Sequence, residues 1–127
     1  MPGERILIVD DNPAGLKLVA YLLEINGYEV TTAPDARSAL DAARSHLPAV
    51  ILMDIQLPDM DGLEAVRQLR STSSSQKTLI FALTAHAMKG DAERAFAAGC
   101  DGYITKPIDT RTLPGIIRRA LASHRVS

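Results

Sequence analysis

The chain has 127 residues, of which 46% are hydrophobic and 23% are charged, and its formal net charge is −1. These values are typical of a globular protein with a buried core, so we expect residues 1–127 to form a single domain. The near balance of 14 basic and 15 acidic residues argues against a nucleic-acid or membrane-surface partner. The single cysteine excludes an internal disulfide and favours a reducing cytoplasm, and no apolar run is long enough to span a bilayer.

The first third of the chain predicts strand, helix, strand and helix. Residues 5–9 are apolar and β-branched, as in a short buried strand, and Asn12-Pro13 then has the N-cap and first-turn chemistry of a helix that stops at Gly27. Residues 28–32 alternate in period two, which favours a strand near the sheet edge. Asp35 is suited to cap a second helix that runs to about residue 45.

The rest of the chain repeats this alternation. Val50 to Met53 form an unbroken apolar run that predicts a strand buried on both faces. A loop over residues 56–61 leads to a helix over 62–70, and a serine-rich linker at 71–75 precedes an apolar strand at 78–84. A helix ending before Gly99, a short strand at 102–105 and a last helix to about residue 123 complete the pattern. Pro114 is tolerated only in a first turn, which places the last cap near Thr112.

Five strands that alternate with five helices predict an α/β fold with parallel strands and right-handed crossovers. A flavodoxin-like doubly wound five-stranded sheet fits best. Its strand order, 2-1-3-4-5, is taken from known sheets of that type and is not dictated by the sequence.

Polar side chains stand where the predicted strands end: Asp10, Asp11, Asp54, Thr84 and Lys106. The carboxyl ends of parallel strands meet at one edge of the sheet, so these groups should converge. Three close carboxylates repel one another, and one lysine is too few to balance them. Oxygen-only ligands favour Mg²⁺, Mn²⁺ or Ca²⁺. The set predicts phosphoryl transfer to Asp54, with Thr84 and Lys106 binding phosphoryl oxygens.

These motifs, in this order, resemble the receiver domain of bacterial two-component response regulators over nearly the whole chain. The stretches at residues 51–58 and 84–91 are especially similar to DivK-type single-domain regulators. The resemblance implies a phosphorylation switch in a His-to-Asp phosphorelay, in which Asp54 is the phosphoacceptor. It also implies that Asp11 binds Mg²⁺ directly, that Asp10 acts mostly through water, that the backbone carbonyl of Gln56 completes the protein ligands, and that Mn²⁺ can substitute.

The resemblance implies further roles around the site. Thr84 and Tyr103 would move on phosphorylation, the Lys106–Pro107 bond would be cis, and the Gln56 and His86 side chains would tune phosphoryl lifetime. The partners would be a histidine kinase or histidine phosphotransfer protein and a downstream protein. That downstream protein would bind the face of the fourth helix, fifth strand and fifth helix. The protein would be no enzyme beyond its own Mg²⁺-dependent phosphorylation and slow dephosphorylation.

Other interpretations stay open at this point. Met1 and the short tail favour a free-standing domain, and a receiver cut from a hybrid histidine kinase is the alternative. An aspartyl-nucleophile phosphatase on a similar fold normally has a second aspartate where Gln56 stands, which counts against that class. A flavin or nucleotide module would not place Asp10-Asp11 beside a phosphate. For single residues, packing alone explains an aromatic such as Tyr103, and an exposed loop position explains His86.

Overall fold

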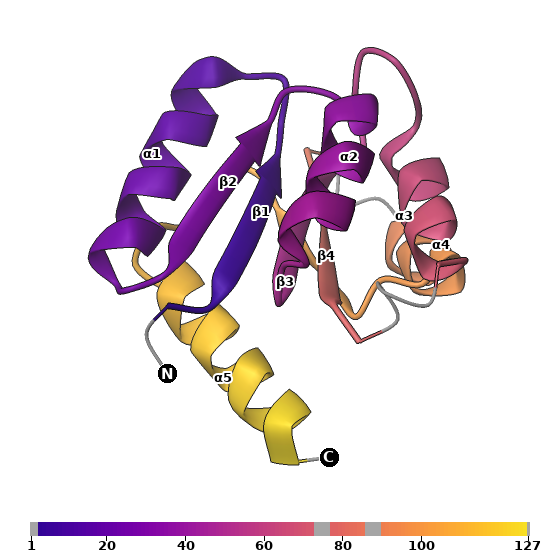
Figure 1. Cartoon of the computed structure of the whole chain (residues 1–127). Helices are drawn as coiled ribbons and strands as arrows, with labels where there is room; N and C mark the ends of the chain where they lie inside the picture. The colour runs from indigo at the N-terminus through magenta and orange to yellow at the C-terminus, as the bar shows by residue number, and fades with distance from the viewer. Residues whose placement is uncertain (1–2, 73–76, 86–89, 127) are drawn as a thin grey trace.

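The structure, a computed structural model, describes residues 3–72, 77–85 and 90–126. Strands and helices alternate along this part of the chain (Figure 1). The strands are β1 (Arg5–Val9), β2 (Glu29–Ala33), β3 (Val50–Asp54), β4 (Leu79–Thr84) and β5 (Gly102–Thr105), and the helices are α1 (Pro13–Ile25), α2 (Ala36–His46), α3 (Gly62–Arg70), α4 (Asp91–Ala98) and α5 (Leu113–Val126).

The strands form one parallel sheet in the order β2-β1-β3-β4-β5, which confirms the predicted flavodoxin-like fold. Every residue of β3 and of β4 is buried, because helices cover both faces of the sheet there. The more polar β2 lies at the edge, as its period-two pattern predicts.

The sheet separates two hydrophobic layers. Side chains of alternate residues point to opposite faces of a strand, so Ile6 and Ile8 pack with α1 and α5, whereas Leu7 and Val9 pack with α2, α3 and α4. Figure 1 shows α1 and α5 on one side of the strands and α2 and α3 on the other. None of the helices within the described ranges is both long and apolar enough to cross a membrane.

Helix ends follow the predicted chemistry. The Asn12 side chain accepts hydrogen bonds from the N–H groups of Ala14 and Gly15 at the start of α1, with Pro13 as the first helical residue. Asp35 caps α2 by accepting from Ser38 N–H. The predicted cap near Thr112 is also confirmed, since α5 starts at Leu113 and its Pro114 lies in the first turn.

Several predicted boundaries were wrong by one to three residues. β2 starts at Glu29, because Tyr28 N–H still bonds to the Leu23 carbonyl of α1. β4 starts at Leu79, and the hydroxyl of Thr78, just before it, donates to the Pro48 carbonyl. α2 runs one residue further to His46 and ends at a left-handed Leu47, and α5 extends to Val126. Residues 73–75 of the serine-rich linker lie outside the described residues.

Arg70, the last residue of α3, joins three segments that are distant in the sequence. Its Nε donates to the Gly99 carbonyl at 2.8 Å and its Nη1 to the Thr78 carbonyl at 2.7 Å. Its Nη2 forms an ion pair with Asp101 Oδ2 at 2.8 Å, and the same oxygen accepts from Ile80 N–H. The guanidinium therefore holds the end of α4 and the start of β4 against α3.

We expect Arg70→Met to lower the free energy of unfolding by about 2–3 kcal/mol, because charge-assisted hydrogen bonds are lost while the apolar stem is kept. Urea denaturation measures this loss. Arg67→Met is the matched control on the same helix. Among the residues that the structure describes, the Arg67 side chain has an exposed ion pair with Glu64 at 3.4 Å, so that change should cost no more than about 0.5 kcal/mol. Equal losses in the two variants would contradict the role assigned to Arg70.

Candidate functional site

The register of the sheet brings the predicted site residues together. Val9 pairs with Met53 and Asp54 pairs with Leu83, so the residue after β1 stands beside the end of β3. Thr84 pairs with Thr105, and the next residue along β5 is a lysine. The polar groups at four strand ends therefore meet at one edge of the sheet, as the sequence predicts.

Asp54 is buried at the centre of this edge, with 4% of its surface exposed. Its Oδ1 accepts a hydrogen bond from Gln56 N–H at 3.0 Å, and its Oδ2 accepts from Lys106 Nζ at 2.8 Å. The carboxylate is thus held at both oxygens by groups from two different segments. A fixed, charged carboxylate is suited to act as a nucleophile.

Asp10 is the second buried carboxylate. Its Oδ1 accepts from Asn12 N–H at 3.1 Å, and its Oδ2 lies 3.0 Å from Lys106 Nζ. Asn12 provides the side-chain cap of α1, so Asp10 is not needed for that purpose. One ammonium group therefore bridges Asp10 and Asp54.

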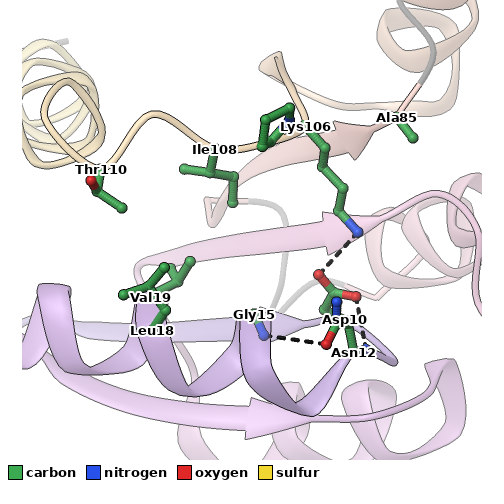
Figure 2. A pocket seen from close by; sticks show the side chains of 10 residues that line it. Asp10, Asn12, Gly15, Leu18, Val19, Ala85, Lys106, Ile108 and Thr110 are labelled. Atoms are coloured by element: carbon green, nitrogen blue, oxygen red, sulfur yellow. Dashed lines mark hydrogen bonds and ion pairs between the residues drawn. The ribbon is translucent and has the colours of Figure 1, made fainter.

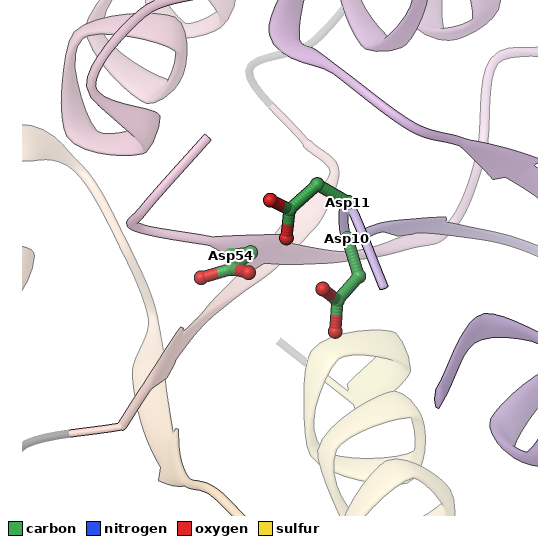
Figure 3. A group of neighbouring side chains, drawn as sticks. All are labelled: Asp10, Asp11 and Asp54. Atoms are coloured by element: carbon green, nitrogen blue, oxygen red, sulfur yellow. The ribbon is translucent and has the colours of Figure 1, made fainter. Parts of the chain in front are cut away.

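Asp11 completes an acidic cluster that is open to solvent on one side. Asp10, Asp11 and Asp54 lie side by side, and each has a carboxylate oxygen within 4.8 Å of such an oxygen of the other two (Figure 3). Asp11 is exposed, whereas the other two are buried. Oxygen ligands at this spacing, partly accessible to water, fit a hard divalent cation that keeps several waters, as Mg²⁺ does.

Burial and ionic contacts act in opposite directions on the charged groups. Burial raises the pKa of Asp54 above its ordinary value, and the hydrogen bond from Lys106 offsets this only in part. Burial also favours a higher pKa for Asp10, but hydrogen bonds from Lys106 and Asn12 outweigh this effect. The pKa of Asp10 is therefore lowered. Burial acts to lower the pKa of Lys106, yet its bonds to Asp54 and Asp10 prevail and raise it. Burial and the contacts with Lys106 therefore shift the pKa values of the two buried carboxyls in opposite directions.

Thr84 and Lys106 border the cluster on its far side. Thr84 is buried at the end of β4, and its carbonyl accepts from Lys106 N–H at 2.7 Å. The Lys106–Pro107 peptide is cis, as the resemblance to receiver domains implies. Thr84 and Lys106 therefore stand on adjacent strand ends.

The remaining predicted residues lie further from the cluster or outside the description. Tyr103 on β5 has 42% of its surface exposed. The Gln56 side chain is exposed, although its backbone N–H binds Asp54. His86 lies outside the described residues. The roles predicted for these three residues stay predictions.

A pocket of about 410 Å³ opens beside the cluster, between α1 and the segment that follows β5. Figure 2 shows Lys106 reaching toward Asp10 on one side of it, with Leu18 and Val19 of α1 opposite Ile108 and Thr110. Its wall is polar at the carboxylates and apolar along α1. A partner that reaches the cluster can thus contact apolar surface next to it.

Residues 6–118 match the response regulator receiver domain family. The chain belongs to this family. Receiver domains act in phosphorylation-dependent signalling, and the DivK polar-differentiation response regulator of Brucella anthropi is 46% identical over 105 residues, 83% of this chain and 85% of that protein. The predicted resemblance to receivers, and to DivK-type regulators among them, is confirmed.

Solved receiver structures agree with this fold. The CheY-like receiver domain protein of Methanospirillum hungatei has a TM-score of 0.90 at 32% identity, covering 97% of each chain. The receiver domain of a sensor histidine kinase of Pseudomonas aeruginosa has a TM-score of 0.84 at 37% identity, covering 92% of this chain and 96% of that one. In that structure a magnesium ion is coordinated in the active-site cleft.

Sequence reasoning missed three residues that shape this receiver site. Asp61 caps α3 by accepting from Leu63 N–H at 2.9 Å, and a capping residue at the predicted helix start was a usable signal. Gly62 packs against the backbone of β3, and Asp59 binds the start of α2. Neither contact has a local pattern in the sequence, because each joins segments through the fold.

Proposed function

We propose that this receiver domain accepts a phosphoryl group on Asp54 from a phosphohistidine, in a reaction that requires Mg²⁺. The donor is a histidine kinase or a histidine phosphotransfer protein. The observation that carries the proposal is the position of Asp54: a buried carboxylate, held by Lys106 and Gln56 N–H, inside a cluster of oxygen ligands. Its membership of the receiver family supports the same reading.

An Asp54 carboxylate oxygen forms a bond to phosphorus while the bond from phosphorus to the donor nitrogen breaks, which leaves an acyl phosphate. The donor nitrogen keeps the electron pair of the broken bond, and a proton on the other ring nitrogen of the phosphohistidine makes the leaving group a neutral imidazole. Lys106 Nζ lies 2.8 Å from Asp54 Oδ2, so it is placed to bind an oxygen of the transferred group. The Thr84 hydroxyl, at the adjacent strand end, would donate a hydrogen bond to a second phosphoryl oxygen.

The metal would be held by Asp11, Asp54 and the Gln56 carbonyl, with Asp10 acting mostly through water. Mg²⁺, or Mn²⁺ in its place, supplies charge neutralisation of the phosphoryl oxygens when bound. The donor set fits this ion because it consists of oxygens only and one carboxylate is exposed.

Phosphorylation would be read at the face formed by α4, β5 and α5. Phe96 on α4 and Tyr103 on β5 are exposed there at 51% and 42%, a surface suited to a protein partner. Thr84 and Tyr103 are the proposed switch, and Gln56 and His86 the proposed tuners of lifetime. The protein has no separate substrate: its reactions are its own phosphorylation and the slow loss of that group. A cytoplasmic location is part of the proposal because the lone thiol, Cys100, fits a reducing compartment.

A receiver within a hybrid histidine kinase is a second candidate context for the same chemistry. Similarity to the receiver of the Pseudomonas aeruginosa sensor kinase favours it, whereas the higher identity to DivK favours the free-standing form.

Incubation with Mg²⁺ and acetyl phosphate, followed by intact mass spectrometry, tests the proposal. We expect one phosphoryl adduct that survives acid, is lost at alkaline pH and requires the metal. Asp54→Asn should abolish it, because an amide is no nucleophile for phosphorus. Asp41→Asn, which removes an exposed carboxylate of α2, is the control and should leave it unchanged. An adduct that persists in Asp54→Asn would overturn the assignment.

A further inference from the structure

Asp59, in the loop between β3 and α3, binds the start of another helix with both carboxylate oxygens. Its Oδ1 accepts from Ala36 N–H at 2.9 Å, and its Oδ2 accepts from Arg37 N–H at 3.0 Å. The hydrogen bond from Ala36 is the main reason that the pKa of Asp59 lies below its ordinary value. A charged side chain of the loop is thus attached to the first two residues of α2.

These bonds give partners to two backbone N–H groups at the start of α2. The first N–H groups of a helix have no partner within it. Asp35 satisfies Ser38 N–H, and the Asp35 carbonyl accepts the first intrahelical bond from Ala39. Ala36 is fully buried, so its N–H has no route to water and depends on the loop carboxylate. Loss of the Asp59 carboxylate would therefore leave this buried N–H group without the partner that it has in the structure.

Backbone contacts fix the base of the same loop. Gln56 and Asp61 form an isolated antiparallel bridge, and Gly62 N–H donates to the Ile55 carbonyl at 2.8 Å. The Asp61 side chain caps α3. Beyond this bridge, Leu57 and Met60 pack against the hydrophobic core, and Asp59 adds a hydrogen-bonded attachment to α2.

We propose that Asp59 is a positioning residue for the metal site: by holding the loop tip to α2, it presets the backbone of Gln56, whose carbonyl is the proposed metal ligand. The inference rests on the proposed function. A loop that is already in place costs less to order when the ion binds, so support from outside the ligand set raises metal affinity. Asp59 acts through the loop and touches neither the metal nor the phosphoryl group.

A purely structural role makes a different prediction. If Asp59 only capped α2, its loss would lower the free energy of unfolding and leave the metal affinity of the folded protein unchanged. Metal affinity, measured separately from stability, distinguishes the two. Asp41 provides a matched control, because Asp41 and Asp59 both line a groove between α2 and α3 and carry the same charge. In the described ranges, the only ion pair of Asp41 is an exposed one with Arg44 at 3.8 Å.

The experiment is a Mg²⁺ titration of the metal-free protein, monitored by the amide chemical shifts in NMR spectra. It compares wild type with Asp59→Asn, Asp59→Ala and Asp41→Asn. We expect the Mg²⁺ dissociation constant to rise about tenfold in the Asp59 variants, as for other outer partners of metal ligands. Asp41→Asn should match wild type. Acetyl phosphate kinetics should show a higher half-saturating Mg²⁺ concentration for Asp59→Asn and an unchanged rate at saturating Mg²⁺.

Two outcomes would overturn the positioning role of Asp59, and a third would overturn the proposed function. A lower melting temperature with unchanged Mg²⁺ affinity in Asp59→Asn would overturn the positioning role and leave a helix cap. An equal loss of affinity in Asp41→Asn would also overturn it, because net charge would then explain the effect. If the wild type itself neither binds Mg²⁺ nor gains a phosphoryl adduct, the proposed function fails, whatever the Asp59 variants do.

Discussion

Gly62→Ala should destabilise the protein by about 3 kcal/mol, at the upper end of the range for overpacking. A Cβ at Gly62 would collide with the Asp54 carbonyl oxygen and would lie 2.8 Å from Ile55 Cα. These are backbone atoms of the central strand and its exit, so no rotamer change relieves the contact. The start of α3 must move away from the end of β3, and Asp54 and the following loop are displaced with it.

Thermal unfolding measures this effect as a fall of about 10 °C in melting temperature. Gly115→Ala is the control, since its added Cβ would meet only the end of the Arg119 side chain at 3.8 Å. That change should be neutral or stabilising by no more than about 1 kcal/mol, because alanine has the higher helix propensity. A Gly62→Ala protein that melts with wild type would show that the close approach is not required. The phosphorylation rate should fall together with the stability.

The fold and the central residues of the site were predictable because both follow from strand patterns. Unbroken apolar runs identified β1, β3 and β4 as interior strands, and the carboxyl ends of parallel strands share one edge of the sheet. The meeting of Asp10, Asp54 and Lys106 needs only that topology, and the structure places all three in contact through one ammonium group. The strand order itself was taken from known flavodoxin-like sheets, because apolar runs alone do not show which interior strands are neighbours.

Contacts between loops and distant helices were not predictable in the same way. Asp59 binds residues that precede it by 22 and 23 positions, and Arg70 bonds to a carboxylate 31 positions further on. Each of these contacts depends on the position that a side chain reaches in the folded protein, and the periodicity of the sequence does not encode that position. The start of β2 was missed for a different reason: Tyr28 N–H bonds to the Leu23 carbonyl of α1, so the strand begins one residue later than its alternating pattern suggests.

Lys106→Met should lower the free energy of unfolding by about 2–3 kcal/mol at neutral pH without metal. This is less than for a fully buried pair, because 25% of the side chain is exposed. Lys106 is the cation that contacts both buried carboxylates in the described part of the chain, at 3.0 Å from Asp10 and 2.8 Å from Asp54. Methionine keeps the length of the side chain but leaves these charges, and the nearby Asp11, without compensation.

The deficit should depend on pH in a defined direction. Burial already raises the pKa of Asp54 above 3.8, and removing Lys106 takes away the bond that opposes this shift and the one that lowers the pKa of Asp10. A carboxyl whose pKa is raised in the folded state is protonated there before it is in the unfolded chain. Stability relative to wild type is therefore recovered as the pH falls from neutral toward 3.8 and is lost again as it rises.

Urea denaturation in chelator, at about pH 7.5 and about pH 4.5, checks this expectation. The deficit should be largest at the higher pH, and Asp54→Asn in the Lys106→Met background should restore part of it by removing one of the repelling charges. Adding Mg²⁺ should stabilise Lys106→Met more than wild type, because the ion replaces the missing positive charge. Lys17→Met, at an exposed position of α1, is the control and should show neither effect. A deficit of the same size at both pH values would mean that lost packing, and not charge compensation, is what Lys106 contributes to stability.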